Sequence, residues 1–459
     1  MRPLPELARL IFTQALADCS IERAMERVLG VSTHGAGADG VSIRLTASGE
    51  DIAALDRLQR LRIVAAGKGA VAMIGALLSR LPLPPSCDLQ GVLIAPVRPQ
   101  NLPASIQFFP GGHPVPNHAS FAGAAAALSM LHALPGAFAD TDTANSLCIF
   151  LLSGGASSMM ELPLDPAISL ADTAAFHQAL VGSGASIVEI NCVRKHFSAV
   201  KGGRLAVAAG AAAKISLLVS DVPPAHLDAL GSGPTLPDPT TVAQCCKVLA
   251  DHSLLDRLPA SVQRFFASPQ LAETPKPGQL VSPAYMVLDA DDLAEAARTR
   301  AADLGFSTSI DNSCDDWDYA AAADYLLDRL RQLRRQHPRV CLISAGELTV
   351  KLPAPNPRAA SAIGGRNQHF ALYLATQLRP SDGPIAVLSA GSDGIDGNSS
   401  AAGAIVDEHT LDGRLSAAQN ALQDFNSSSF LTGVGATVVT GPTGHNLRDL
   451  RILLADASQ

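Results

Sequence analysis

The sequence predicts an α/β fold arranged in two or three domains. Short apolar runs such as residues 147–152 are too short for a helix and suit strands that are buried on both faces. Segments with helical character separate these runs. The 37 glycines and the aromatic content of 4% fit a turn-rich protein with an aliphatic interior, and 459 residues exceed the usual length of a single domain.

The first part of the chain is predicted to alternate between helices and strands. Residues 1 to about 30 predict one amphipathic helix, in which Leu7, Ile11 and Ala15 share a face and which Gly30 ends. The next elements form a βαβ unit of the usual size. In order, the expected elements are a strand at 61–66, a helix at 70–81, a strand at 91–97, a helix at about 120–133, and strands at 147–152 and 215–219.

A polar and proline-rich stretch at about residues 265–283 predicts a domain boundary. We therefore expect an N-terminal domain over residues 1–265 and a C-terminal domain over residues 280–459. The strands expected in the second domain lie near residues 284–288, 340–343, 385–389, 404–407 and 435–440, with helices between them.

The composition argues against several classes of function. The net charge of −8 provides no basic surface for nucleic acid, and the run Arg331–Arg335 is interpreted as a solvated helix face. The eight cysteines form no C-x-x-C pair, so they are expected as small core residues in a reducing compartment. We find neither a secretory signal nor an apolar run of about 20 residues. A cytoplasmic protein without membrane or nucleic-acid partners is expected.

Four predicted strands run into a hydroxyl residue that glycine follows closely. These segments are Ser153–Ser158, Ser344–Glu347, Ser389–Gly394 and Thr440–Gly444. Glycine lets the backbone turn sharply and approach a ligand, and α/β folds bind ligands at the carboxyl edge of the sheet. The recurrence favours a cleft lined with phosphate-sized anion sites.

Lys68 lies between two glycines directly after a predicted strand. An ammonium group beside turn N–H groups suits a phosphate. A competing interpretation stays open, because Gly67, Gly69 and Ala72 satisfy the dinucleotide fingerprint G-x-G-x-x-A. The fingerprint is incomplete, because the following strand ends at Val97 without an acidic residue to hold a ribose.

Other charged residues near predicted turns suit anions or proton transfer. Asp221 follows the strand at 215–219, where it can act as an acid or base, bind Mg²⁺ or cap a helix. Residues 191–204 contain five potential cations, which in an acidic protein favour an anionic ligand or a solvated helix face. Arg366 follows Gly364-Gly365, so its guanidinium fork suits a phosphate or a carboxylate.

Taken together, these motifs resemble the class II glycerate kinase family, whose C-terminal part is called the MOFRL domain. The resemblance covers nearly the whole chain. It is carried in order by Ala66–Lys68, Gly112–Pro116, Leu152–Ser157, Arg194–His196, Lys201–Ala206, Ser220–Pro223, Gly231–Thr235, Pro237–Thr240, Gly364–Gln368, Ser392–Gly397 and Thr440–Asn446.

The resemblance implies two three-layer α/β/α domains, the first Rossmann-like with a mainly parallel sheet and the second smaller with a mixed sheet. It places the active site in the interdomain cleft. The implied reaction is ATP- and Mg²⁺-dependent phosphorylation of D-glycerate at its 2-hydroxyl, which gives 2-phospho-D-glycerate and ADP. The implied catalytic residues are Lys68, Asp221 and Arg366. Family members have also been named hydroxypyruvate reductases, a reaction that would need NAD(P)H at Gly67–Ala72.

We therefore predict that Lys68 and Arg366 neutralise the transferring phosphoryl group, and that Asp221 accepts the hydroxyl proton or binds Mg²⁺. The predicted ATP- and phosphate-binding residues are Ser153, Gly154, Gly155, Ala156, Ser157, Lys201, Gly231, Ser232, Gly233, Asn367, Thr440, Gly441 and Asn446. The predicted substrate-binding residues are His113, Lys195, His196, Arg204 and Asp393. The alternatives are an NAD(P)H-dependent hydroxypyruvate reductase and a non-catalytic sugar-acid sensor. A homodimer is left open.

Overall fold

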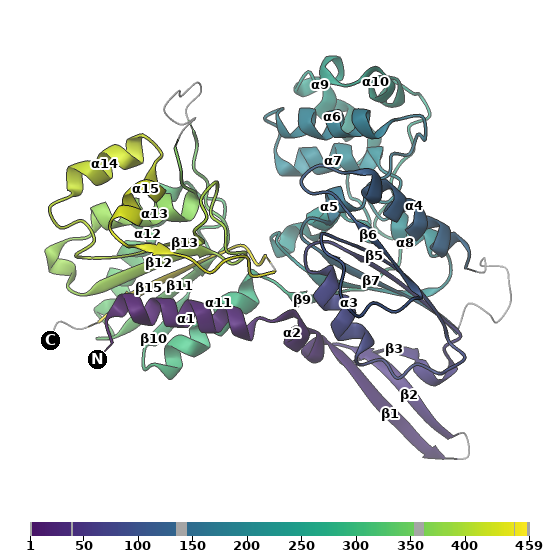
Figure 1. Cartoon of the computed structure of the whole chain (residues 1–459), viewed down its shortest axis with the longest axis horizontal. Coiled ribbons are helices and arrows are strands. Elements are labelled where there is room, and N and C mark those ends of the chain that lie inside the picture. The colour runs from purple at the N-terminus through teal and green to yellow at the C-terminus, as the bar shows by residue number, and fades with distance from the viewer. Residues whose placement is uncertain (1, 38–39, 135–144, 353–361, 445, 457–459) are drawn as a thin grey trace. The chain divides into compact units, whose positions relative to one another are not determined.

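The structure is a computed structural model that describes residues 2–37, 40–134, 145–352, 362–444 and 446–456. The chain forms two compact units (Figure 1). The N-terminal unit is Ile21–Val287, and the C-terminal unit combines Met1–Ser20 with Leu288–Gln459. Each unit has its own sheet and its own core.

The N-terminal unit is built on a six-stranded sheet with the strand order β6-β5-β4-β7-β8-β9. The pairs β6–β5, β5–β4, β4–β7 and β7–β8 are all parallel. The strands are β4 (Arg60–Ala66), β5 (Asp88–Ala95), β6 (Ile106–Pro110), β7 (Ser146–Ser153), β8 (Ala213–Val219) and β9 (Ala284–Leu288). Because β4, β7 and β8 run in the same direction, the turns after them all lie at one edge of the sheet.

Helices cover both faces of this sheet. Val64, Phe150 and their neighbours on one face pack against α4 (His118–His132) and α8 (Arg204–Ala208). Alternate residues such as Ile63 point to the other face, where α3 (Ala70–Leu78) packs on β4, β5 and β7. Every residue of β7 is buried, which explains why its apolar run predicts a strand so clearly.

Two smaller parts complete the N-terminal unit. A helical cluster with its own apolar core contains α6 (Leu170–Val181), α7 (Ile187–Phe197), α9 (Val242–Asp251) and α10 (Ala260–Phe266). An antiparallel sheet follows α2 (Ile21–Val28) and contains β1 (Leu29–Gly37), β2 (Gly40–Ala47) and β3 (Glu50–Ala54). The short elements α5 (Ala156–Met159) and the 3₁₀ segment η3 (Pro224–Ser232) follow β7 and β8.

The C-terminal unit contains a mixed sheet with the order β10-β11-β15-β12-β13-β14. Only β10 and β11 pair in parallel, and the other neighbours are antiparallel. The strands are β10 (Ser307–Ile310), β11 (Val340–Ala345), β12 (Ile385–Gly391), β13 (Gly403–Asp407), β14 (Thr437–Val438) and β15 (Asp449–Ala455). The helices are α1 (Leu4–Asp18), α11 (Ala290–Asp303), α12 (Tyr319–Arg334), α13 (Arg366–Gln377), α14 (Leu415–Gln423) and α15 (Ser427–Gly433).

These helices form the outer layers of the C-terminal unit. In Figure 1, α1 and α11 lie on one face of the sheet, and α12 to α15 lie on the other. The prediction of two three-layer α/β/α domains, with a mainly parallel first sheet and a mixed second sheet, is confirmed.

The two units differ from the expected division at residues 1–265 and 280–459. Residues 1–30 form two helices instead of one, and α1 belongs to the C-terminal unit because its buried stripe, including Ile11 and Phe12, packs on β12 and β15. The strand at 284–288 is β9, at the edge of the first sheet, and not a strand of the second. The sequence predicted neither β10 nor β15.

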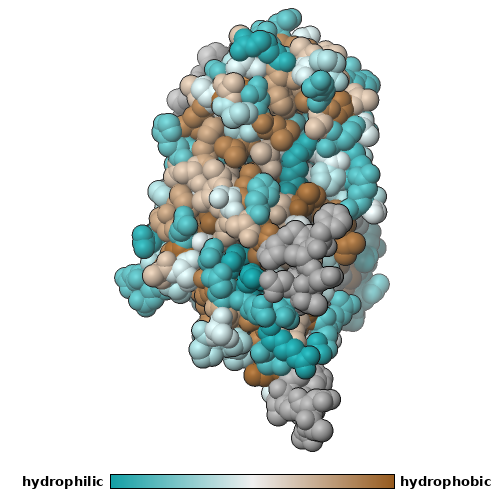
Figure 2. All heavy atoms as spheres, turned by 90° about the vertical axis from the view of Figure 1, so that its right-hand side faces the viewer, coloured by the Kyte–Doolittle hydropathy of each residue, from teal (hydrophilic) through white to brown (hydrophobic). Residues whose placement is uncertain are grey.

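Among the described residues, no helix is long and apolar enough to cross a bilayer. Figure 2 shows one face, on which hydrophobic and hydrophilic residues are interspersed. Exposed apolar side chains include Val181 at the end of α6 and the adjacent pair Ile187 and Val188 at the start of α7.

Candidate active site

The turn around Lys68 is held by the protein's own hydrogen bonds. The N–H groups of Gly67, Lys68 and Gly69 donate to the carbonyl of Ile94 (3.1 Å), the carbonyl of Gly154 (2.9 Å) and the Ser153 hydroxyl (2.9 Å). None of these three N–H groups is left for the pyrophosphate of a dinucleotide, and the Ser153 hydroxyl is taken up by the N–H of Gly69. The exposed Lys68 side chain remains available to a ligand.

Glycine is needed where this turn meets the end of β7. Gly67 has a φ of +120°, which L side chains rarely adopt, and a Cβ there would lie 2.3 Å from Ser153 Oγ. The ends of β4 and β7 therefore approach each other more closely than a side chain at position 67 would permit.

Lys68, His113 and Asp221 surround the glycine pair that follows β7. A Cβ on Gly154 would lie 2.3 Å from Oδ2 of Asp221. A Cβ on Gly155 would lie 3.5 Å from Nδ1 of His113 and 3.5 Å from Cγ of Lys68. The structure thus brings together two predicted catalytic residues, one predicted substrate ligand and the predicted phosphate turn.

His113 is neutral in this setting. Burial, followed by the positive charge of Lys68, lowers the pKa of His113 below its ordinary value. Its Nδ1 lies 3.0 Å from the Ser158 hydroxyl. A neutral imidazole beside an ammonium group offers a hydrogen bond without adding charge repulsion.

The predicted phosphate-binding segments 153–157 and 231–233 lie against each other. The hydroxyls of Ser157 and Ser232 are 2.9 Å apart, and Ser232 donates to the side-chain carbonyl of Asn191 (2.8 Å). In the described part of the chain, no acceptor takes the N–H groups of Gly155, Ala156 and Ser157, at the start of α5. These N–H groups are the backbone donors that an anion can use.

Arg366, at the start of α13, is clamped by two carboxylates in the C-terminal unit. Its Nε lies 2.5 Å from Oδ2 of Asp449, and its Nη2 lies 2.8 Å from Oε1 of Glu347. Burial alone would lower the pKa of Arg366, but Asp449 and Glu347 more than offset this effect and raise the pKa above its ordinary value, so the guanidinium stays charged. Burial also raises the pKa of Glu347, although Arg366 opposes this. The predicted cation is therefore held in one orientation and remains 37% exposed.

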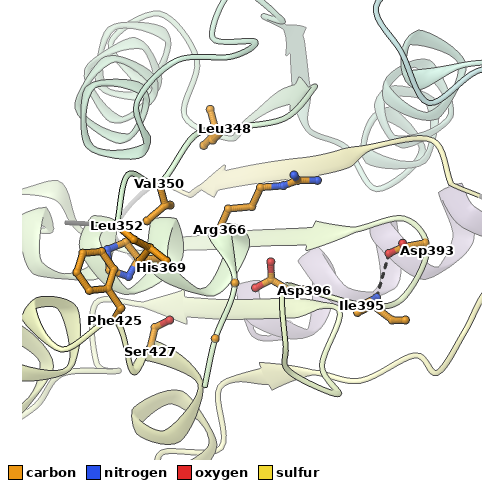
Figure 3. A pocket seen from close by; sticks show the side chains of 13 residues that line it. Leu348, Val350, Leu352, Arg366, His369, Asp393, Ile395, Asp396, Phe425 and Ser427 are labelled. Carbon is orange, nitrogen blue, oxygen red and sulfur yellow. Dashed lines mark hydrogen bonds between the residues drawn. The ribbon is translucent and has the colours of Figure 1, made fainter. Parts of the chain in front are cut away.

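The N-terminus of α13 is already occupied by Asp396 (Figure 3). This buried carboxylate accepts the backbone N–H groups of Asn367 (3.0 Å) and Gln368 (2.9 Å), as well as their side-chain amides. Burial raises the pKa of Asp396 to about 6 despite these donors. Asn367, which is predicted to bind phosphate, is 2% exposed, and its side chain is bonded to Asp396 and Ser389.

The predicted segments at 392–397 and 440–446 also lie together. The Thr443 N–H donates to the carbonyl of Asp393 (3.2 Å), and the carbonyl of Gly441 lies against Gly394. Thr440 is exposed, and the side chain of Asn446 accepts the N–H of Arg448 (2.9 Å). Asp393 therefore lies beside the predicted phosphate turn at 440–441, and residue 445 lies outside the described residues.

Lys201 has a structural partner instead of the predicted phosphate. Its ammonium contacts Oε2 of Glu161, which also lies 2.8 Å from Nε2 of His177. Lys201 and Glu161 are both 0% exposed. Burial opposes the ionisation of Glu161, but the charge of Lys201 and the hydrogen bond from His177 lower the pKa of Glu161 to about 2. The phosphate-binding role of Lys201 stays a prediction, and in this structure Glu161 engages its buried ammonium.

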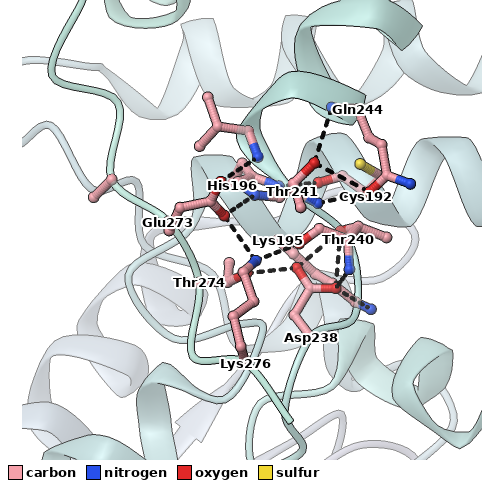
Figure 4. A network of polar contacts seen from close by, with 12 residues as sticks. Cys192, Lys195, His196, Asp238, Thr240, Thr241, Gln244, Glu273, Thr274 and Lys276 are labelled. Atoms are coloured by element: carbon pink, nitrogen blue, oxygen red, sulfur yellow. Dashed lines mark hydrogen bonds and ion pairs between the residues drawn. The ribbon is translucent and has the colours of Figure 1, made fainter. Parts of the chain in front are cut away.

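The other predicted cations of this segment also have partners within the unit (Figure 4). The Lys195 ammonium lies 2.5 Å from Asp228 and 3.2 Å from Asp238. His196 is fully buried, with Nδ1 bonded to the carbonyl of Cys192 (2.8 Å). Arg204 donates to main-chain carbonyls, including that of Lys195 (2.8 Å). These three residues, which are predicted as substrate ligands, are engaged by groups around α7 in this structure.

Sequence reasoning missed the partners that fix the charged residues. Asp449 and Glu347 hold Arg366, Glu161 holds Lys201, and Asn191 orients Ser232. Asn191 stood in the cation-rich segment, and Glu347 followed one of the hydroxyl–glycine turns, so both were within motifs already noted. Asp449 had no such signal, because the strand that it begins was not predicted.

The fold and these residues define a two-domain α/β protein whose charged side chains gather at strand ends. Residues 7–267 match the family model described as "Domain of unknown function (DUF4147)", and residues 340–449 match the model described as "MOFRL family". The chain belongs to the class II glycerate kinase family.

Three relatives illustrate this membership. The D-glycerate 2-kinase of Thermotoga maritima is 34% identical over 353 residues, which are 75% of this chain and 79% of the relative. A protein of Agrobacterium vitis named "Putative hydroxypyruvate reductase" is 34% identical over 403 residues, or 86% and 87% of the two chains. The crystal structure of Thermotoga maritima glycerate kinase superposes with a TM-score of 0.78 at 30% identity, covering 98% of this chain and 99% of that chain.

We expect Glu161→Gln to lower the unfolding free energy by about 3–5 kcal/mol near neutral pH, because Lys201 loses its buried partner. The pKa of Glu161 is about 2 in the folded protein and ordinarily 4.5. Its contribution is therefore present above the ordinary pKa and lost as the pH falls toward the folded value. Urea unfolding should show a difference between variant and wild type that shrinks from about pH 7 to about pH 3.

The matched control is Glu295→Gln, which removes an exposed ion pair with Arg298. That change should alter stability by less than about 1 kcal/mol. A difference for Glu161→Gln that stayed constant over the same pH range would contradict the ion-pair interpretation.

Proposed function

We propose that this protein is a glycerate 2-kinase, which transfers the terminal phosphoryl group of ATP to the 2-hydroxyl of D-glycerate. The observation that carries the proposal is the convergence of Lys68, His113 and Asp221 on the Gly154–Gly155 turn. Relatives named D-glycerate 2-kinase and glycerate kinase support the same reaction.

Phosphoryl transfer requires mainly positioning and charge stabilisation. The Lys68 ammonium supplies positive charge for the transferring group, and the N–H groups at Gly155–Ser157 supply hydrogen bonds to its oxygens. Asp221 accepts the proton of the attacking hydroxyl, because its carboxylate borders the same turn. Neutral His113 donates or accepts a hydrogen bond without repelling Lys68.

Mg²⁺ fits this residue set as a partner of the nucleotide. A nucleotide-bound Mg²⁺ takes one or two carboxylates and completes its shell with phosphate and water oxygens, and Asp221 can supply one carboxylate. Among the described residues, no group of three His, Cys, Asp or Glu side chains could hold a metal by itself. Bound Mg²⁺ would neutralise phosphate charge.

Arg366 is the second cation that we assign to the reaction. Its two carboxylate partners keep the guanidinium charged and oriented, while more than a third of the side chain stays exposed. A fixed and charged fork suits a phosphate or the glycerate carboxylate. Asp393 stays a proposed substrate-binding residue, and Thr440 and Gly441 stay proposed phosphate-binding residues. All three belong to the same unit as Arg366.

The competing reductase would need a nicotinamide dinucleotide at Gly67–Ala72, and the name of the Agrobacterium vitis relative keeps this alternative in view. The hydrogen bonds of the turn disfavour it. The N–H groups of Gly67, Lys68 and Gly69 are all donated within the protein, whereas the dinucleotide motif leaves such groups to the pyrophosphate.

The deciding experiment offers the protein ATP, Mg²⁺ and D-glycerate, and passes the product directly to enolase. ADP release with immediate enolase turnover is the expected result, because enolase accepts 2-phosphoglycerate. ADP release with turnover only after phosphoglycerate mutase is added would indicate transfer to the 3-hydroxyl. NAD(P)H oxidation with hydroxypyruvate, without ADP release, would establish the reductase instead.

Lys68→Ala should lower kcat by about 10²–10³-fold, because the developing phosphoryl charge loses its cation. The circular dichroism spectrum should not change, since the side chain is exposed. Lys247→Ala, which removes an exposed lysine from α9, is the control and should retain wild-type turnover. Near-normal turnover of Lys68→Ala would remove Lys68 from the mechanism.

Gly154→Ala tests whether Asp221 must lie against the glycine pair. The new Cβ would meet Oδ2 of Asp221 at 2.3 Å, so the carboxylate must move. We expect a loss of about 10²-fold in kcat, as displacement of a reacting group by about 1 Å produces. Gly75→Ala is the control, because nothing lies within 4 Å of its added Cβ. Equal activity of both variants would contradict the role of Asp221.

A further inference from the structure

A cavity of about 500 Å³ opens in the C-terminal unit beside the start of α13 (Figure 3). Its volume lies within the range of small-molecule sites, about 300–1,000 Å³. The residues that line it come from the segment after β11, from the turn after β12, and from the first turns of α13 and α15 with the residues just before them. The reaction assigned above uses only Arg366 and Asp393 of this lining.

One end of the cavity is apolar and aromatic. In Figure 3, Val350, Leu352, His369 and Phe425 lie together at this end. The rings of His369 and Phe425 are stacked at 5.3 Å with an interplanar angle of 8°, so this aromatic pair is formed before any ligand binds. Leu352 is 61% exposed, a large apolar surface left beside the cavity.

His369 adds a polar atom to this apolar end. Its side chain is 3% exposed, and its Nε2 has no hydrogen-bond partner among the described residues. Burial lowers the pKa of His369 to about 4, so the imidazole is neutral near pH 7. An unpaired buried polar atom is costly and calls for a partner. A heterocycle with ring nitrogens can provide one.

The opposite end of the cavity is charged. Figure 3 shows Arg366 and Asp393 on the side away from His369 and Phe425. The guanidinium of Arg366 suits a phosphate, and a carboxylate such as Asp393 suits the hydroxyls of a ribose. The cavity therefore changes from apolar to charged along its length.

This gradient fits one of the two substrates of the proposed reaction. Glycerate carries an oxygen on every carbon and has no apolar surface to bury. A nucleotide has an aromatic base at one end and phosphates at the other. We infer that this cavity binds the nucleoside part of the phosphoryl donor, an inference that rests on the proposed function. The base lies between Val350 and the His369–Phe425 pair, and the phosphates point toward Arg366.

Val350→Trp tests this inference, because the larger side chain fills the base end without changing charge. Calorimetric titration of the full-length protein compares ADP with inorganic pyrophosphate, which lacks the nucleoside. We expect the variant to bind ADP at least about tenfold more weakly, a loss of about 1.4 kcal/mol, and to bind pyrophosphate as the wild type does. Equal ADP affinity, or an equal loss for both ligands, would overturn the inference.

Two further variants control for folding and for surface changes. Ile395→Ser alters a lining residue that is 50% exposed, so it threatens the fold less. Because Ile395 lies beside Asp393, where the ribose is placed, this change should also weaken the binding of ADP more than that of pyrophosphate. Leu415→Ser changes a residue of the same unit that is likewise 50% exposed but does not line this cavity. Leu415→Ser should bind ADP and pyrophosphate with the affinities of the wild type. An equal loss of ADP affinity in Leu415→Ser would overturn the assignment.

Steady-state kinetics separates this inference from the proposed function. If the wild type phosphorylates glycerate, Val350→Trp should raise the KM for ATP and not that for glycerate. A raised KM for glycerate alone would assign the cavity to the hydroxy acid and overturn the inference. If the wild type binds ADP but transfers no phosphate, the proposed reaction fails, while selective loss of ADP in Val350→Trp would still support the nucleoside site.

Discussion

The N-terminal unit depends on the close approach of three strand ends around a pair of glycines. The parallel strands β4, β7 and β8 bring Lys68, Ser153 and Asp221 to the same edge of the sheet. The carboxylate of Asp221 lies where a side chain on Gly154 would stand. Any side chain at this position would push Asp221 away from the turn. The parallel strands place the charged residues at one edge of the sheet, and the absence of a Cβ on Gly154 allows Asp221 to lie close to the turn.

Burial removes two lysines of the most basic segment from contact with a ligand. Lys195 and Lys201 come from the most basic segment of the sequence, yet both are buried against carboxylates. A buried charge is tolerated when it is paired and hydrogen-bonded, and such pairs fix the loops that carry them. Lys68 has no comparable burial. The chemistry of an anionic substrate then depends on cations that stay accessible at the strand ends, such as Lys68.

The sequence predicted those features that depend on local patterns. The apolar run of β7 and the glycines around Lys68 signalled a buried strand and a tight turn, and both are present. Strand β15 was missed because Asp449 and Arg451 interrupt its apolar pattern, although it lies between β11 and β12. The partners of the cations were also missed. Whether a lysine meets a substrate or a glutamate depends on segments distant in sequence, such as Lys201 and Glu161.

The hydroxyl–glycine turns look alike in sequence but differ in which hydroxyl and backbone N–H groups they leave available to a ligand. Ser153 accepts the N–H of Gly69, and Ser389 donates to Asn367, so both hydroxyls stabilise neighbouring turns. At the start of α13, Asp396 takes the N–H groups that an anion would need. Among the described residues, the start of α5 keeps such donors free. One short turn with free N–H groups and a few accessible charges would suit the transfer of a phosphoryl group better than it would suit a dinucleotide, which needs an extended set of backbone donors.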